Sequence, residues 1–427
     1  MSTVRAAWGT GWWREEARLC LALFAVALVL RVATVVYVNR SYSTFVFAPD
    51  SRLYDGLAKS LVAGEGYAIG GDHREYTRIA PVFPIYLAVL YGLFGRGVQI
   101  VGLANALVGS LTCLIMYGIG RKLLSRWAAA LGGFLATACW EFLFWTPFVL
   151  KETLALFLFS GALLLVLESL ERGSRKVAFL GGCALGLASL ARYPHLAFFP
   201  FLIGAFILSA DRKRLRTLIL PLILGGGLAL TPWLARNYVV FGEVLLSNHG
   251  PARAFYLTHG PGKVEDTRGY AAPEGLDLKR IEEMDQQGTS AHARERSYLR
   301  SFLAQVTADP WRLARLVGAK VVNMWRPTWE KFRFQFPIIH IPFTVTYAIL
   351  LALGLVGLVL HTRETGRLSL LHVVLLYYLA AHTLWWAEIR NRVYLMPYVI
   401  VFAAYAVQVV ANRWSGRWQA SPGGDDV

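Results

Sequence analysis

The chain has 427 residues, of which 56% are hydrophobic and 16% are charged, and its formal net charge is +16. Soluble domains carry about 25% charged residues, so this composition excludes an ordinary soluble class. A strongly basic chain can bind nucleic acid, but here the Lys and Arg residues stand in short loops between long apolar blocks. That placement is typical of a multi-pass membrane protein, and we expect no nucleic-acid partner.

Ten apolar blocks predict an all-α polytopic membrane protein with about ten transmembrane helices, because about 20 mainly apolar residues suffice to cross a bilayer. Residues 1–18 precede the first block, and residues 412–427 form a polar tail after the last. The expected spans are 19–38, 98–119, 127–145, 152–170, 177–191, 195–210, 217–235, 337–360, 368–386 and 393–411.

The apolar segment from Pro81 to Gly95 is expected to be a half-inserted helix, since it has only about 15 residues and begins Pro-Val-Phe-Pro. With a cytoplasmic N-terminus, this choice leaves 17 Lys and Arg residues in the inner segments and four in the short outer loops. The positive-inside rule favours that distribution. We therefore expect a plasma (inner) membrane protein with both termini in the cytoplasm.

Two long polar segments then form extracytoplasmic loops. Residues 39–80 are the first outer loop of an N-terminal transmembrane module, 19–235. Residues 236–336 form a large loop before the C-terminal transmembrane helices, 337–411. In the large loop, Asp309 followed by Pro310 predicts the start of a helix, since Asp is a good N-cap and Pro suits the first helical position.

The first outer loop contains acidic and basic candidates for chemistry. Asp50 follows Pro49 at the position expected for a helix N-cap, and Tyr54 and Asp55 follow about one turn later. Asp50 can be a cap without any other role, or it can face an aqueous cavity. Arg78, just before Pro81, is either an interfacial arginine or a phosphate contact.

The other candidates lie at or beside the ends of apolar blocks, on the same expected face of the membrane. Glu152, beside Lys151, starts one block, and Arg236 ends another after a Thr-Pro-Trp turn. Arg390 and Arg392 lie in the one short outer loop that breaks the charge rule. An anionic ligand would explain these two arginines, and lipid headgroups are the alternative.

Metal and disulfide chemistry receive no support from residue spacing. His249 has no second histidine or carboxylate at metal-ligand spacing nearby. Cys20, Cys113, Cys139 and Cys183 all lie inside apolar blocks and form no CxxC pair, so we interpret them as small buried hydrophobic residues. We assign no metal ligands. Whether a divalent metal acts as a cofactor stays open.

Taken in order, these motifs resemble the membrane glycosyltransferases of the C superfamily. The resemblance is to the bacterial branch related to protein O-mannosyltransferases, of the glycosyltransferase family 39 type, and to the lipid A aminoarabinose transferase. The residues that carry it are Pro49-Asp50-Ser51 with Tyr54, Gly64-Glu65-Gly66-Tyr67, Arg78 with Pro81 and Pro84, Pro232-Trp233 with Arg236-Asn237, Phe241-Gly242, and Arg392-Val393-Tyr394 with Pro397.

The resemblance implies transfer of a sugar from a polyprenyl-phosphate donor, with inversion, to a lipid, glycan or protein acceptor outside the membrane. It implies that Asp50 is the catalytic base and that Glu152 is the acidic residue of the second outer loop. Where many relatives carry an Asp-Glu pair, this chain has Asp50-Ser51. A metal is bound by some relatives and not by others.

We expect the basic residues to hold the donor phosphate, since arginine binds phosphate with two parallel hydrogen bonds. These residues are Arg78, Arg236, Arg390 and Arg392. The expected substrate-binding residues are Tyr54, Asp55, His249 and Tyr394.

Three other functions compete with glycosyl transfer. A secondary transporter would show internal repeats and charges near mid-membrane, and Arg31 is the clearest charge inside a span. A polymerase or ligase of cell-surface glycans would also have a large outer loop. A structural membrane protein would have no chemistry at all.

Overall fold

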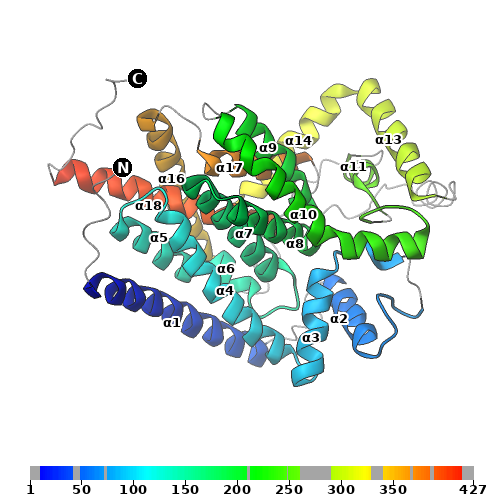
Figure 1. The fold of residues 1–427 in the computed structure, drawn as a ribbon, viewed down its shortest axis with the longest axis horizontal. Coiled ribbons are helices and arrows are strands. Elements are labelled where there is room, and N and C mark those ends of the chain that lie inside the picture. Colours follow the sequence, from blue (N-terminus) through cyan, green and yellow to red (C-terminus); the bar gives the residue numbers. More distant parts are fainter. Residues whose placement is uncertain are drawn as a thin grey trace.

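The structure, a computed structural model, describes residues 10–41, 49–71, 75–208, 212–247, 249–259, 290–327, 340–365, 369–384 and 389–415. Parts of both expected outer loops, half of the expected N-terminal cytoplasmic segment and most of the C-terminal one therefore lie outside the described residues. The described part is built from helices, which confirms the all-α polytopic class (Figure 1).

Six described helices are long and apolar enough to cross a membrane. They coincide with six of the ten expected spans. These helices are α1 (Thr10–Ser41), α4 (Val98–Gly120), α7 (Glu152–Arg172), α10 (Arg212–Phe241), α16 (His340–Thr365) and α18 (Met396–Trp414).

The other four expected spans coincide with shorter helices. These are α5 (Arg126–Ala138) with α6 (Trp140–Trp145), α8 (Arg175–Ala191), η3 (Tyr193–Ala197) with α9 (Phe198–Leu208), and α17 (Leu370–Leu384). The helix expected over 127–145 is thus wrong as one element, because Cys139 has an extended backbone (φ −64°, ψ 116°). The break places Glu141 against Arg392, 3.1 Å away. A buried carboxylate needs such a partner.

The half-inserted segment forms α3 (Val82–Phe94), after a short turn η2 (Glu75–Arg78). Its 13 residues span about 20 Å at 1.5 Å per residue, less than the roughly 30 Å of a hydrocarbon core. The helix length therefore fits the prediction, and the depth of insertion stays a prediction.

Helices α8 and α10 pack closely because glycines face each other at the contact. A Cβ atom on Gly182 would lie 2.0 Å from the carbonyl oxygen of Leu222, and one on Gly225 would lie 2.0 Å from that of Phe179. Small residues allow this approach between membrane helices. The tight pair fixes the end of α8, from which the cavity receives part of its lining.

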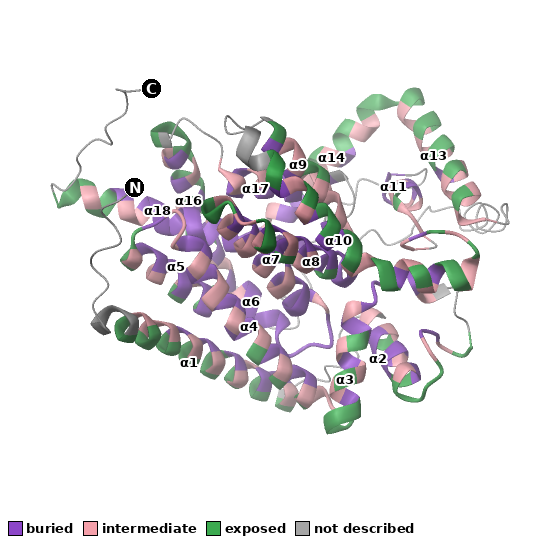
Figure 2. Cartoon of the chain, viewed as in Figure 1, coloured by how far each residue is buried: buried purple, intermediate pink, exposed green. Residues whose placement is uncertain are grey.

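Many residues along the outer faces of the long helices are exposed, as Figure 2 shows for α1 and α10, and many of these residues are large and apolar. Leu21, Leu220 and Ile349 are more than half exposed. Soluble proteins rarely leave such extended apolar surface open to water. A lipid-facing surface explains it, in agreement with a multi-pass membrane protein.

Four further helices come from the two expected outer loops. They are α2 (Pro49–Val62), α11 (Pro251–His259), α13 (Ala291–Ala308) and α14 (Pro310–Trp325). In Figure 1, α2, α11 and α13 lie at the end of the molecule opposite the first turns of α1 and the last turns of α18. The Asp309 side chain accepts from the Arg312 N–H at 2.9 Å, so the predicted cap of α14 is confirmed.

Candidate active site

Asp50 stands in the first turn of α2 and is not its N-cap as expected, because the helix already begins at Pro49. Pro suits a first helical position, since its missing N–H needs no partner there. Asp50 is followed by Ser51, Tyr54 and Leu57, which are buried and fix α2 against its neighbours. The carboxylate of Asp50 therefore has a fixed position while it remains partly exposed.

Asp50 lines a cavity of about 340 Å³ that brings together segments from distant parts of the chain. The walls come from the start of α2, the end of η2, the start of α7, the turn before η3, the first half of α11, and η4 (Ile389–Tyr394). Its charged lining residues are Asp50, Arg78, Lys151, Glu152, Arg192, Arg253 and Arg390. Five are basic and two acidic, so the cavity suits an anionic ligand.

The Asp50 carboxylate is paired across the cavity. Arg390 Nη1 donates to Asp50 Oδ2 at 3.0 Å. Burial raises the pKa of Asp50, but the charges of Arg390, Lys151 and Arg78 outweigh it, and the pKa of Asp50 is lowered overall. Asp50 is therefore ionised at neutral pH, as a general base must be.

The start of α7 contributes two adjacent residues of opposite charge. Glu152 is 1% exposed, and its Oε2 atom has no hydrogen-bond partner among the described residues. The Lys151 ammonium lies 5.8 Å from the centre of the Tyr54 ring. Burial, followed by the charge of Arg192, lowers the pKa of Lys151 to about 8.

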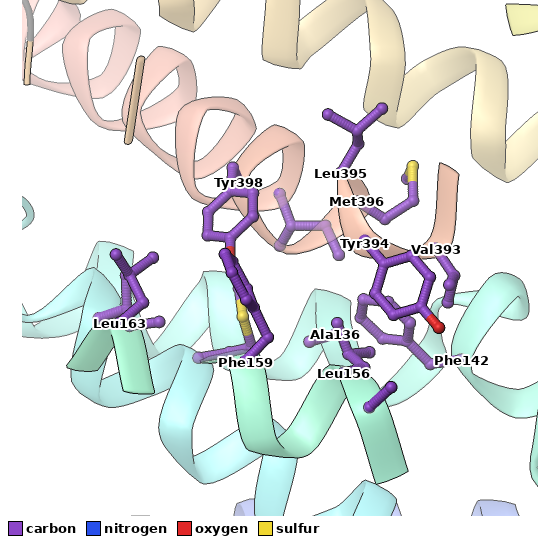
Figure 3. Close-up of a cluster of buried hydrophobic side chains, with 14 of the residues drawn as sticks. Ala136, Phe142, Leu156, Phe159, Leu163, Val393, Tyr394, Leu395, Met396 and Tyr398 are labelled. Atoms are coloured by element: carbon purple, nitrogen blue, oxygen red, sulfur yellow. The ribbon is translucent and has the colours of Figure 1, made fainter. Parts of the chain in front are cut away.

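Arg192 connects the turn before η3 to the η4 segment. Its Nη2 donates to Asn391 Oδ1 at 2.6 Å, and its guanidinium lies 4.5 Å from the Tyr394 ring centre. Tyr394 is fully buried beneath the cavity. Figure 3 places it among apolar side chains such as Val393 and Phe142. Tyr394 thus supports a cavity residue and does not itself line the cavity.

The opposite wall comes from α11 and the turn before it. His249, Gly250 and Arg253 line the cavity there. The Glu295 carboxylate of α13 accepts from the N–H groups of Gly250 at 2.9 Å and Ala252 at 2.8 Å. A carboxylate at a helix N-terminus is stabilised by the unpaired N–H groups and the helix dipole. Glu295 therefore fixes α11 in place.

Six of the ten predicted site residues line the cavity, and four do not. The six are Asp50, Tyr54, Arg78, Glu152, His249 and Arg390. The other four have partners elsewhere. Tyr394 supports Arg192, as described above, and Asp55 is held by both nitrogens of an Arg96 fork at 2.8 and 2.9 Å.

Arg236 and Arg392, expected at the donor phosphate, also lie away from the cavity lining. Arg236 donates to the Tyr67 carbonyl oxygen at 3.2 Å and lies over the Trp233 ring. Arg392 is fully buried, pairs with Glu141, and lies 3.8 Å from the Tyr347 ring centre. These contacts favour structural roles for both arginines.

Arg192, Arg253, Asn391 and Lys151 line the cavity and were not among the site residues predicted from the sequence. Arg192 follows directly on an apolar block, which was the signal available in the sequence. As for metals, no group of three or more His, Cys, Asp or Glu side chains that could hold an ion occurs among the described residues.

Comparison with known proteins agrees with the helical membrane architecture. The dolichyl-phosphate-mannose-protein mannosyltransferase family matches residues 78–235. No curated protein matches the chain. The archaeal oligosaccharyltransferase AglB from Archaeoglobus fulgidus, in complex with an inhibitory peptide and a dolichol-phosphate, is 16% identical with a TM-score of 0.57. That match covers 96% of this chain and 53% of AglB.

Two further solved structures are similar. The apo form of the Archaeoglobus fulgidus oligosaccharyltransferase is 17% identical with a TM-score of 0.57, over 92% of this chain and 51% of that one. ArnT from Cupriavidus metallidurans, bound to undecaprenyl phosphate, is 16% identical with a TM-score of 0.47, over 95% of this chain and 79% of that one. The chain spans about half the length of the oligosaccharyltransferases it matches.

The chain is therefore a polytopic membrane protein whose helical fold is similar to that of about half of the Archaeoglobus fulgidus oligosaccharyltransferase. Within that architecture, residues 78–235 match the dolichyl-phosphate-mannose-protein mannosyltransferase family, in agreement with the resemblance to protein mannosyltransferases expected from the sequence.

Proposed function

We propose that this protein is a membrane glycosyltransferase, which moves a sugar from a polyprenyl-phosphate donor to an acceptor hydroxyl on the outer face of the membrane. The observation that carries the proposal is the ionised Asp50 carboxylate, paired with Arg390 in a cavity with five basic side chains. A base beside a concentration of positive charge suits a reaction in which a hydroxyl loses a proton and a phosphate leaves.

In the proposed reaction, Asp50 removes the proton of the acceptor hydroxyl while the hydroxyl oxygen bonds to the anomeric carbon. The bond between that carbon and the phosphate oxygen breaks, and its electron pair leaves with the polyprenyl phosphate. Asp50 later gives the proton to water. Attack opposite the leaving group inverts the anomeric configuration, and general-base help of this kind contributes about 10²–10⁴-fold.

The leaving phosphate needs its negative charge balanced, because it departs without a proton. Arg78 and Arg390 lie in the cavity walls and are suited to this by their two-pronged geometry. A donor carried on lipid also accounts for a cavity at the end of a helical membrane body, since the substrate can enter sideways from the bilayer. The complex of AglB with a dolichol-phosphate supports a lipid-phosphate ligand.

The acceptor would reach the cavity from the side of α11, whose wall includes His249 and Arg253. Its class is left open as lipid, glycan or protein. The gathering of α2, α11 and α13 at the end opposite the first turns of α1 supports an extracytoplasmic site with a cytoplasmic N-terminus.

The purified protein, incubated with a polyprenyl-phosphate sugar and a mixture of envelope acceptors, tests the proposal. We expect release of polyprenyl phosphate that depends on the acceptor, together with sugar of inverted anomeric configuration on the product. Absence of release with every donor sugar, from protein shown to bind the donor, would contradict glycosyl transfer and would favour a transporter.

A further inference from the structure

We propose that Lys151 binds the phosphate of the lipid-linked donor and that its ammonium is the titrating group on which donor binding depends. The inference rests on the proposed function, because it names the ligand of one residue in the same cavity. It goes beyond the arginines expected from the sequence, among which Lys151 had no place.

The first support is the state of the neighbouring cations. Arg390 is already paired with Asp50, and Arg192 is held by Asn391. The Lys151 ammonium, although it lines the cavity, forms no hydrogen bond or ion pair with any residue that the structure describes. A half-buried ammonium without an acceptor is costly, and a ligand oxygen in the cavity would satisfy it.

The second support is the position of Lys151, directly before α7 and over the Tyr54 ring. The ring face favours a cation but supplies no hydrogen-bond acceptor in line with it. Neither nearby carboxylate, Asp50 nor Glu152, lies within ion-pair distance of the Lys151 ammonium among the described contacts. The ammonium is therefore positioned for an anionic ligand.

The charges around Lys151 make its protonation respond to such a ligand. Asp50 and Tyr54 face it from α2, Glu152 from α7, Arg192 from the turn before η3 and Arg390 from η4. The remaining charged or titratable lining residues are Arg78, His249 and Arg253. Burial and Arg192 hold the pKa of Lys151 at about 8 in the empty cavity, whereas a bound phosphate would raise it.

The direction of the pH dependence follows from this. Below pH 8 Lys151 is mostly protonated, and the affinity for the donor is at its maximum. The affinity falls as the pH rises above 8, because Lys151 loses its charge. Because the pKa of Asp50 is lowered and that of Tyr54 is raised, Asp50 stays deprotonated and Tyr54 stays protonated at pH values around 8. Of Asp50, Tyr54 and Lys151, Lys151 is therefore the one that titrates in this window.

Binding of undecaprenyl phosphate and of uncharged undecaprenol to the purified full-length chain tests the inference, at about pH 7 and about pH 9.5. We expect the native protein to bind undecaprenyl phosphate more tightly than undecaprenol. The Kd for undecaprenyl phosphate should rise about tenfold or more from the lower to the higher pH, because one charged hydrogen bond is lost. Lys151→Met should lose about tenfold at the lower pH and show no further change. Lys151→Arg should keep the affinity at both.

Lys176→Met is the matched control, because Lys176 is an exposed lysine at the start of α8, outside the cavity lining. It should bind like the native protein. Retained undecaprenol binding shows that Lys151→Met is folded. If Lys151→Met does not fold, the pH dependence of donor binding by Lys151→Arg tests the inference instead.

Native affinity and native pH dependence in Lys151→Met would overturn the inference, as would an undiminished pH dependence in Lys151→Arg. Displacement of the lipid by an equal concentration of inorganic phosphate would also overturn it, in favour of a free-phosphate site. If the native protein does not distinguish undecaprenyl phosphate from undecaprenol, the proposed function fails along with the inference.

Discussion

Arg390 Nη1 lies 3.0 Å from Asp50 Oδ2 and joins two residues that are 340 positions apart in the chain. Both residues line the same cavity. Among the charges that lower the pKa of Asp50, that of Arg390 has the largest effect. The contact therefore couples the proposed base to the segment that carries the proposed phosphate ligand. Each end of the contact can be changed separately.

Arg390→Ala should move the acid limb of the pH–rate profile to higher pH. Without Arg390 the pKa of Asp50 rises, so the carboxylate becomes protonated, and transfer is lost, at a higher pH than in the native protein. Arg390→Lys should restore much of the charge but only part of the activity, since lysine lacks the bidentate fork. The pH dependence of kcat/KM measures both effects.

Arg96→Ala is the control for this prediction, because Arg96 pairs with Asp55, which does not line the cavity. That variant should leave the acid limb in place. An acid limb that does not move in Arg390→Ala would mean that Asp50 is not the titrating base.

Arg236→Ala should lower stability while the donor KM stays near its native value. The Arg236 guanidinium holds the Tyr67 carbonyl and lies over Trp233, away from the cavity. Arg78→Ala should instead raise the donor KM and leave stability near its native value, because Arg78 lines the cavity. Thermal unfolding in detergent and donor KM separate the two. A large increase of the donor KM in Arg236→Ala with an unchanged Tm would mean that Arg236 binds the donor phosphate, as first expected.

Arg392→Ala should destabilise the protein by about 3–5 kcal/mol, because it leaves Glu141 as an unpaired buried charge. The two side chains are 0% and 4% exposed and 3.1 Å apart. The double variant Arg392→Met with Glu141→Gln should recover part of the loss. Unfolding by denaturant measures both. Equal stability of the single variant and the native protein would show that the pair contributes nothing.

Gly250→Ala should weaken the attachment of α11, since the added Cβ would lie 2.6 Å from the Glu295 carboxylate carbon. The loss should be about 1.5–3 kcal/mol, the magnitude for a charged hydrogen bond, with transfer reduced as the α11 wall shifts. Glu295→Ala should produce the same loss, and the two losses should not add. Gly318→Ala is the control, because a Cβ there meets nothing within 4 Å.

Much of the cavity was predictable because a membrane protein has few places for charge. Asp50 and Arg78 lie in the first outer loop, and Glu152 and Arg390 lie beside apolar blocks. The positive-inside count predicted one face of the membrane for all four. Residues that share a face and cannot enter lipid converge on the same aqueous space. The length and apolar character of the six long helices were equally visible in the sequence.

The other features of the site depend on side-chain directions and helix breaks that only the tertiary structure shows. Arg390 and Arg392 are two residues apart in η4, yet one enters the cavity and the other points to Glu141. No Pro or Gly marks the break at Cys139, which is set by tertiary contacts. Arg253 stood among many charges in a polar loop, so its place in the wall only becomes visible once Glu295 has docked α11.

The central claim is that Asp50 is the base of a glycosyl transfer, and the transfer rate of Asp50→Asn tests it most directly. Asn keeps the size of the side chain but cannot accept the proton, so folding and donor binding should persist while transfer falls by roughly 10²-fold or more. Asp55→Asn, outside the cavity, should transfer at close to the native rate. Native transfer by Asp50→Asn, with loss in Glu152→Gln or Asp55→Asn instead, would contradict the account.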